Sequence, residues 1–253
     1  MIWKVIGQSV IGSSHLQNGK GCEDAGTYRV FTMPDDSEAL ICFASDGAGS
    51  AEYADQASAA AVSAAIEFAL NLLGNGEDLT DASLLALGEH VYDRLCELAD
   101  ALRTPKNECS CTLLGCIILP EKAGFLQIGD GAIVRNDGYD HFTPIWWPSN
   151  GEYQNSTVFV IDDADLANLN YKVIDEPITE VALFTDGLQQ LALNYESMTA
   201  HQPFFANLFP ALRKAEISEH LSILTTRLSD YLSGSAISSR TDDDKTLLLA
   251  TRA

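Results

Sequence analysis

The sequence predicts an α+β fold in which antiparallel sheets are covered by pairs of helices. The first supporting observation is the order of the apolar segments, which runs strands, two helices, strands, two helices and a final strand. The second is that strands follow one another directly along the chain. In a parallel fold built from βαβ units, strands and helices would alternate. The third is size. The chain has 253 residues, 46% of them hydrophobic, so we expect a single domain over residues 1–253.

The first three segments are short and rich in β-branched and apolar residues. Residues 3–12, 27–33 and 39–45 read as strands, and their spacing predicts a β-meander. A polar, glycine-rich loop over residues 13–21 separates the first two. Pro34-Asp35-Asp36 forms a turn between the second and the third.

The next segment changes to helical spacing. Residues 51–73 are rich in alanine, and Gly74 ends the apolar pattern. A second helix is expected from about residue 80 to 103, because leucines and a valine recur along one stripe until Pro105. The short glycine-rich loop between them predicts an antiparallel pair.

Strand patterns then return, followed by a second helix pair. Clear strands are expected at residues 111–119, 124–129, 132–136, 180–185 and 246–251, and weaker ones at 141–145, 158–161 and 171–174. Asp137-Gly138 reads as a hairpin turn. The aromatic stretch 145–155 reads as a surface loop. Two helices are expected near the C-terminus, from Pro203 through Leu212 and over residues 218–232.

The net charge of the chain limits the classes of molecule that it can bind. The net charge is −21 and the pI is about 4.3, which excludes nucleic acid and anionic membranes as ligands because both require basic surfaces. We find no apolar window of 18 residues and no secretory signal, so a cytoplasmic protein is expected. The six cysteines lack C-x-x-C spacing, which argues against structural zinc. Disulfides are not expected in a reducing compartment.

Three apolar strands end on the dipeptide Asp-Gly, at Asp46, Asp130 and Asp186. A single Asp-Gly is most often a turn, but three at strand ends favour a shared metal site. Converging carboxylates repel by about 4 kcal/mol per pair at ~4 Å, so they need protons or a cation. Oxygen ligands suit Mg²⁺ or Mn²⁺. The candidate ligands are Glu23, Asp24, Asp46, Asp130, Asp186 and Asp243.

Taken in order, the motifs of this chain resemble those of the protein phosphatase 2C family, the metal-dependent PPM Ser/Thr phosphatases. The motifs are Cys22-Glu23-Asp24, Ser45-Asp46-Gly47-Ala48-Gly49-Ser50, Ser110-Cys111-Thr112, Gly129-Asp130-Gly131, Thr185-Asp186-Gly187 and Asp243-Asp244-Lys245-Thr246. The short length resembles a compact bacterial subgroup. The resemblance implies an α-β-β-α sandwich of two antiparallel sheets flanked by helix pairs, with a metal centre at one edge.

The resemblance also implies roles for individual residues. Asp46 would bridge two Mn²⁺ or Mg²⁺ ions. Glu23 and the Gly47 carbonyl would complete one ion, and Asp186 with Asp243 would complete the other.

Asp130, together with Asp186, would bind a third ion, and Asp24 would lie behind the ligands. A water activated between two ions would then hydrolyse phosphoserine or phosphothreonine in proteins phosphorylated by a Ser/Thr kinase. Two or three ions and a monomeric enzyme are therefore expected.

This chain departs from the family pattern at three positions. Gly19 stands where the family has a phosphate-binding arginine. His15 or Lys20 could substitute, and we favour His15 as a catalytic residue beside Asp46 and Asp186. Ala48 replaces a histidine that some relatives carry, and Asp244 replaces the more familiar asparagine.

These losses leave two other functions open. One is a catalytically weak or inactive regulator that keeps the fold and binds a kinase or phosphoprotein. The other is a phosphoesterase for small molecules, with the aromatic loop 145–153 lining its pocket.

Overall fold

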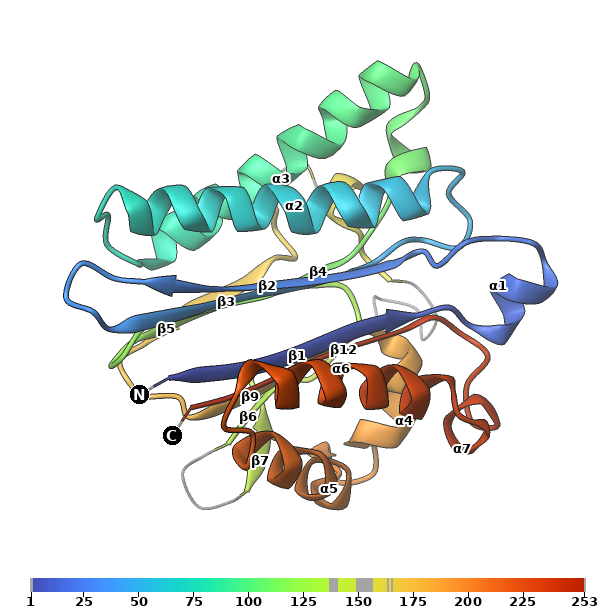
Figure 1. The fold of residues 1–253 in the computed structure, drawn as a ribbon. Helices are drawn as coiled ribbons and strands as arrows, with labels where there is room; N and C mark the ends of the chain where they lie inside the picture. The colour runs from blue at the N-terminus through green and yellow to red at the C-terminus, as the bar shows by residue number, and fades with distance from the viewer. Residues whose placement is uncertain (1, 137–140, 149–156, 163, 165, 253) are drawn as a thin grey trace.

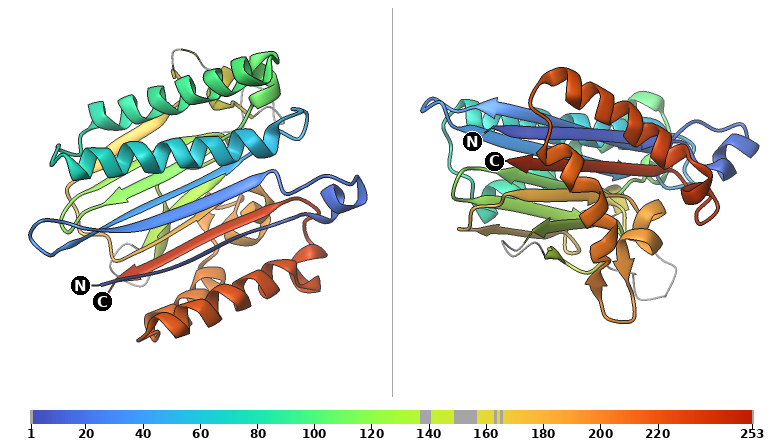
Figure 2. Two further views of the ribbon diagram at one scale, coloured as in Figure 1. Left: turned by 45° about the horizontal axis from the view of Figure 1, so that its top comes forward. Right: turned by 60° about the horizontal axis from the view of Figure 1, so that its bottom comes forward.

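The computed structural model describes residues 2–136, 141–148, 157–162, 164 and 166–252. Two five-stranded antiparallel sheets face each other, with helices on both outer sides (Figure 1). The left view of Figure 2 shows the same succession of helices, sheets and helices. The predicted α+β class and the α-β-β-α sandwich are therefore confirmed.

The first sheet has the strand order β1-β12-β9-β6-β7. Its strands are β1 (Trp3–Val10), β12 (Lys245–Arg252), β9 (Glu180–Phe184), β6 (Ala132–Asn136) and β7 (Phe142–Pro144). The second sheet has the order β2-β3-β4-β5-β8. Its strands are β2 (Asp24–Thr32), β3 (Glu38–Asp46), β4 (Leu113–Ile118), β5 (Ala123–Ile128) and β8 (Asn170–Ile174).

Alternation along β3 shows how one strand serves two cores. Leu40, Cys42 and Ala44 point between the sheets, whereas Ile41 and Phe43 point to the helices on the outer face. Both faces are buried, so the strand reads as a continuous apolar run rather than as an alternating one.

The outer face of the second sheet is covered by α2 (Ala54–Gly74) and α3 (Asp81–Leu102). Small residues of α2, including Ala57, Ala61 and Ala65, have no exposed surface, which allows the helix to approach the sheet closely. A capping box between Thr80 and Ser83 begins α3.

Helix α2 is the only helix among the described residues that is long and apolar enough to cross a membrane. This is a criterion of length and composition alone, and 56% of the helix's most apolar window is buried inside the protein. The burial identifies α2 as a core helix.

Helices α5 (Gln202–Arg213) and α6 (Ser218–Ser233) lie on the outer side of the first sheet. Phe205 and Phe209 of α5 stack on Phe142 of β7, with ring centroids 5.1 and 4.9 Å apart. Leu228 and Leu232 of α6 join the same buried cluster. Both predicted helix pairs are therefore present.

Several local expectations are wrong. The first three strands form no meander, because β1 pairs with β12 from the far end of the chain and only β2 and β3 pair as neighbours. The expected loop 13–21 begins with a short helix, α1 (Ser13–Gln17). The expected strand at 158–161 contains instead the 3-10 helix η2 (Val160–Asp162), joined to the adjacent segment by a Val160 N–H that donates to the Cys111 carbonyl.

The remaining short elements complete the chain. A 3-10 helix, η1 (Lys106–Cys109), precedes β4. After β9 come η3 (Asp186–Leu188), α4 (Gln189–Ala192) and a two-stranded hairpin of β10 (Leu193–Asn194) and β11 (Thr199–Ala200), and α7 (Ser235–Ser238) follows α6. The expected turn at residues 137–138 and most of the aromatic loop 145–155 lie outside the described residues.

Candidate metal centre

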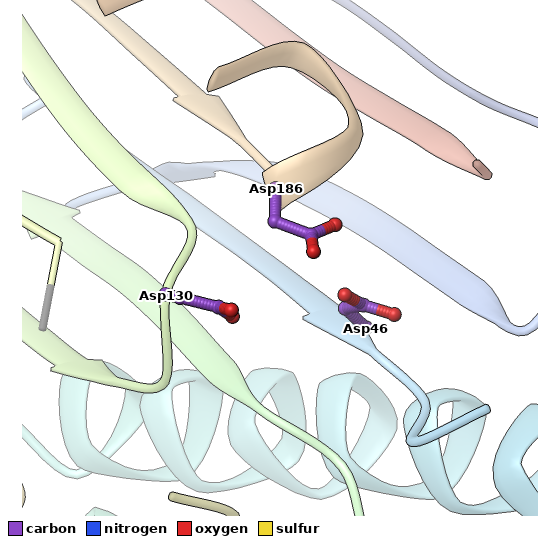
Figure 3. A group of neighbouring side chains, drawn as sticks. All are labelled: Asp46, Asp130 and Asp186. Atoms are coloured by element: carbon purple, nitrogen blue, oxygen red, sulfur yellow. The ribbon is translucent and has the colours of Figure 1, made fainter. Parts of the chain in front are cut away.

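Three strand ends from both sheets bring Asp46, Asp130 and Asp186 together. Asp46 is the last residue of β3, Asp130 lies in the turn between β5 and β6, and Asp186 follows β9 as the first residue of η3. One carboxylate oxygen of each lies within 4.8 Å of those of the other two. Figure 3 shows the three side chains pointing toward one common space.

Close packing requires glycine at the positions beside these aspartates. A Cβ on Gly187 would collide with the carbonyl oxygen of Asp244, and a Cβ on Gly47 would lie 2.5 Å from the carbonyl oxygen of Ala54. Gly129, before Asp130, has a φ of +103°, which side chains other than glycine rarely adopt. The Gly-Asp-Gly and Asp-Gly motifs therefore permit turns tight enough for the carboxylates to converge.

Burial and mutual repulsion raise the pKa values of these acids. The pKa of Asp46 is well above its ordinary value, first because of burial and then because of nearby carboxylates, Asp24 foremost. Burial followed by Asp130 and Asp243 raises the pKa of Asp186 to about 7. Burial also raises the pKa of Asp130, against the hydrogen bond from Thr157.

A cavity of about 330 Å³ opens on the cluster. Its walls include Asp243, which brings a fourth acid to the same space. The lining consists of His15, Asp46, Gly47, Ala48, Gly49, Asp130, Thr157, Phe159, Asp186 and Asp243. Within the described part of the chain, no lysine, arginine or histidine forms an ion pair with Asp46, Asp130 or Asp186.

Asp24 lies behind Asp46, as its neighbour in the β2–β3 register. Its Oδ2 accepts a hydrogen bond of 2.7 Å from the Thr185 hydroxyl, while its buried Oδ1 has no partner. Burial, opposed by the Thr185 and Thr246 hydrogen bonds, raises the pKa of Asp24 to about 7. Thr185 also accepts from the backbone N–H of Thr246, so it ties β9 to β12 behind the cluster.

Glu23 is 7% exposed and approaches the site from the segment before β2. Its Oε1 accepts from Lys20 Nζ at 2.9 Å, and its buried Oε2 has no hydrogen-bond partner. Thr112 braces the neighbouring strand end, because its Oγ1 accepts from the Asp46 backbone N–H at 2.9 Å.

The two candidates for phosphate binding, His15 and Lys20, both face carboxylates. His15 Nδ1 lies 2.8 Å from Asp244 Oδ2, and His15 Nε2 lies 3.6 Å from Glu23 Oε2. Lys20 Nζ donates to Glu23 and, at 2.8 Å, to the Gly49 carbonyl. His15 also lines the cavity, whereas Lys20 does not.

Several residues at this end of the molecule could not be identified from the sequence. Thr157 donates to Asp130 Oδ2 at 2.6 Å, and Gln189 donates to the Asp130 carbonyl. Phe159 forms part of the cavity wall. Among the residues that support the ligands through hydrogen bonds, Thr185 did stand in a recognisable motif, Thr185-Asp186-Gly187. Thr157 and Gln189 reach the site through tertiary packing that no local pattern encodes.

A family model for protein phosphatase 2C matches residues 11–233. The chain belongs to the protein phosphatase 2C family. It is 34% identical over 251 residues to Serine/threonine-protein phosphatase 3 of Escherichia coli (strain K12), which covers 99% of this chain and 98% of that protein. The match at this identity extends to both ends of the predicted site, from Glu23 to Asp243.

Solved structures share the fold at lower identity. PppA, a key regulatory component of T6SS in Pseudomonas aeruginosa, aligns with a TM-score of 0.64 and 17% identity, over 99% of this chain and 98% of that one. RsbX, crystallised in complex with magnesium, aligns with a TM-score of 0.57 and 16% identity, over 99% and 96%.

Proposed function

We propose that the protein is a Mg²⁺- or Mn²⁺-dependent phosphatase that removes phosphate from phosphoserine and phosphothreonine in proteins. The observation that carries the proposal is the convergence of Asp46, Asp130 and Asp186 on one cavity, with no protein cation paired to them in the described residues. Each ionised pair in such a cluster costs roughly 3–4 kcal/mol at an effective dielectric near 20. A family known for two-ion catalysis supplies the matching chemistry.

The donor set fits a hard divalent cation. All of its side-chain donors are carboxylate oxygens, and buried oxygens of Glu23 and Asp24 lack hydrogen-bond partners. Asp46 would bridge two ions, with Glu23 and the Gly47 carbonyl on one side and Asp186 and Asp243 on the other. Asp130 would contribute to a third. The bound ions would supply an acidified water for attack on phosphorus and would screen the phosphate charge.

Neighbouring residues hold the predicted metal ligands in place. Thr112 and Thr185 fix the strand ends that carry Asp46 and Asp186. Thr157 and Gln189 hold the turn that carries Asp130. Asp24 accepts a hydrogen bond from Thr185, which would hold its carboxyl group in place behind the bridging ligand. A preorganised set of oxygens lowers the reorganisation needed on metal binding.

Phosphorylated proteins as substrates follow from the activity named for the Escherichia coli relative. The cognate kinase, the cytoplasmic location and the monomeric state stay predictions. The phosphate-binding role of His15 also stays a prediction, and its two ring nitrogens already face Asp244 and Glu23.

A catalytically weak regulator is the second candidate. The specific observation in its favour is that both Lys20 and His15 are engaged with acids of the site, so neither offers an uncommitted cation to a substrate phosphate. A protein of this kind would bind metal and a phosphoprotein but turn over slowly.

Hydrolysis of an aryl phosphate and of a phosphothreonine peptide, with Mn²⁺, with Mg²⁺ and with EDTA, tests the proposal. We expect metal-dependent turnover that EDTA abolishes. Folded protein that binds Mn²⁺ without turnover supports the regulator, and activity that survives EDTA refutes the two-ion proposal. A preference for the aryl phosphate over the peptide of more than a hundredfold in kcat/KM would point to small-molecule substrates.

A further inference from the structure

Asp244 lies next to the predicted ligand Asp243 and is 2% exposed. It stands where the family pattern has the more familiar asparagine. The structure gives its carboxylate three donors. Gly12 N–H donates to Oδ1 at 2.6 Å, Glu23 N–H donates to Oδ2 at 2.5 Å, and His15 Nδ1 lies 2.8 Å from Oδ2.

These contacts join segments that are far apart in the chain. Gly12 and His15 lie at the start of the segment between β1 and β2, Glu23 lies at its end, and Asp244 directly precedes β12. The Ser14 N–H also donates to the Asp242 carbonyl at 2.9 Å. A Cβ on Gly12 would lie 2.6 Å from the Asp243 carbonyl oxygen, so the two backbones are packed tightly together.

Asp244 also contacts both predicted halves of the metal centre. Its side chain accepts from the backbone of Glu23, and its own backbone N–H donates to Asp243 Oδ1 at 2.9 Å. In the proposed function, Glu23 belongs to one ion and Asp243 to the other. One buried residue therefore fixes the relative position of ligands on both sides of the centre.

The donor pattern at Asp244 requires an acceptor at both side-chain oxygens. A backbone N–H points at each oxygen, and a backbone N–H cannot become an acceptor. Asparagine would place an amide NH₂ against one of these N–H groups in either orientation, leaving a buried donor without a partner. The resemblance leads one to expect asparagine here, and this chain instead carries an acceptor-only side chain.

His15 completes the arrangement on the other side. With Nδ1 bonded to Asp244, its Nε2 is directed at Glu23 Oε2, 3.6 Å away, and the His15 side chain is 13% exposed. The distance from Nε2 to Oε2 is too long for a hydrogen bond, so His15 acts on Glu23 through Asp244. The Asp244 Oδ2 atom contacts both His15 Nδ1 and the Glu23 backbone N–H. His15 thus braces Glu23 through Asp244.

We propose that Asp244, acting with His15, is a positioning residue that holds Glu23 and Asp243 in the geometry needed to bind two divalent ions. The proposal rests on the proposed function, because it assigns Glu23 and Asp243 to the metal centre. It predicts that loss of the Asp244 contacts weakens metal binding itself, before any effect on chemistry.

Calorimetric titration of Mn²⁺ into the metal-free protein tests this directly. The Asp244→Asn variant should bind Mn²⁺ at least tenfold more weakly than the wild type. Asp242→Asn removes the same charge from an exposed position two residues earlier and should stay within twofold. Circular dichroism and thermal unfolding restrict the comparison to temperatures at which every variant is folded.

Variants of His15 give the second arm. His15→Ala should weaken Mn²⁺ binding about tenfold, and His15→Asn should recover part of the loss, because its Nδ2 stands near the position of the imidazole Nδ1. In the His15→Ala/Asp244→Asn double variant, the losses should be less than additive because both changes break one network.

The outcomes separate the two hypotheses. A wild-type protein that binds no Mn²⁺ overturns the proposed function. A wild type that binds Mn²⁺, together with a folded Asp244→Asn variant of unchanged affinity, overturns the positioning role alone. If His15→Ala leaves Mn²⁺ affinity unchanged but raises KM for phosphate substrates, His15 contacts phosphate and does not brace Glu23.

Discussion

Two regions of this protein bury carboxylates, and they differ in whether the chain supplies a cation to neutralise the buried charge. Glu180, at the start of β9, is 3% exposed and is surrounded by donors. Its two oxygens accept from Arg213 Nε and Nη2, both at 2.7 Å, from Asn136 at 2.8 Å and from Thr251 at 2.9 Å. The cation and the hydrogen bonds for this acid come from the chain itself.

Asp46, Asp130 and Asp186 lie at strand ends, and Asp186 follows the end of β9 opposite to Glu180. Their nearest charged neighbours are other carboxylates, and burial raises the pKa of each. Burial alone therefore does not mark a functional acid. What distinguishes Asp46, Asp130 and Asp186 is that no lysine, arginine or histidine of the described residues forms an ion pair with them. The cation binding of the proposed function requires such an arrangement.

The largest expected effect is on turnover. Asp46→Asn should lower kcat about a thousandfold or more, equivalent to roughly 4 kcal/mol, because the bridging carboxylate is lost. Thermal unfolding of the metal-free variant should show no loss of stability, since the change removes one repelling charge. Retained Mn²⁺-dependent activity would remove Asp46 from its proposed role.

Arg213→Met should destabilise the protein by about 3 kcal/mol, because it leaves the buried Glu180 without its cation. Urea unfolding measures the change. The double variant Glu180→Leu/Arg213→Met should recover a large part of this loss, and kcat per folded molecule should stay within twofold. An Arg213→Met protein as stable as the wild type would show that Glu180 does not need the cation.

Mn²⁺ should stabilise the wild type by about 2.7 kcal/mol at a free concentration a hundred times its Kd. The gain should be nearly absent in Asp46→Asn, and Arg213→Met should keep it because its altered charge pair lies elsewhere. Urea unfolding with and without Mn²⁺ provides the comparison. Equal stabilisation of all three proteins would mean that Mn²⁺ acts outside the acidic cluster.

A smaller effect should depend on pH in the metal-free protein. The Asp186 pKa is about 7 when folded and 3.8 in its ordinary state, so between these values the folded state holds a proton that the unfolded chain has lost. Rising pH through this window therefore weakens folding. Asp186→Asn should stabilise the metal-free protein by roughly 1–3 kcal/mol at pH 8 and by almost nothing at pH 4. A gain independent of pH would contradict the raised pKa.

The sequence predicted what local patterns encode. Apolar runs ending in Asp-Gly identified Asp46, Asp130 and Asp186, because strand and turn signals lie within a few residues of each other. The same reasoning failed for the pairing of β1, whose partner β12 lies at the far end of the chain. Periodicity shows that a segment is a strand but not which strand it will pair with.

Contacts between side chains far apart in the chain could not be predicted from the sequence either. Glu180 and Arg213 are 33 residues apart, and no sequence pattern shows that they form a buried pair. Asp244 was visible as one more acid, but its three donors come from Gly12, His15 and Glu23, more than 200 residues earlier. Only the assembled fold separates an acid that fixes the backbone from acids with uncompensated charge.

A crystal structure of the protein soaked in Mn²⁺, with anomalous diffraction recorded to locate the ions, tests most directly whether the acidic cluster binds them. We expect at least two anomalous peaks in the cavity, with Asp46 touching both, and none at Glu180. Peaks absent from the cavity at saturating Mn²⁺, or a protein cation found between Asp46 and Asp186, would contradict the proposed metal centre.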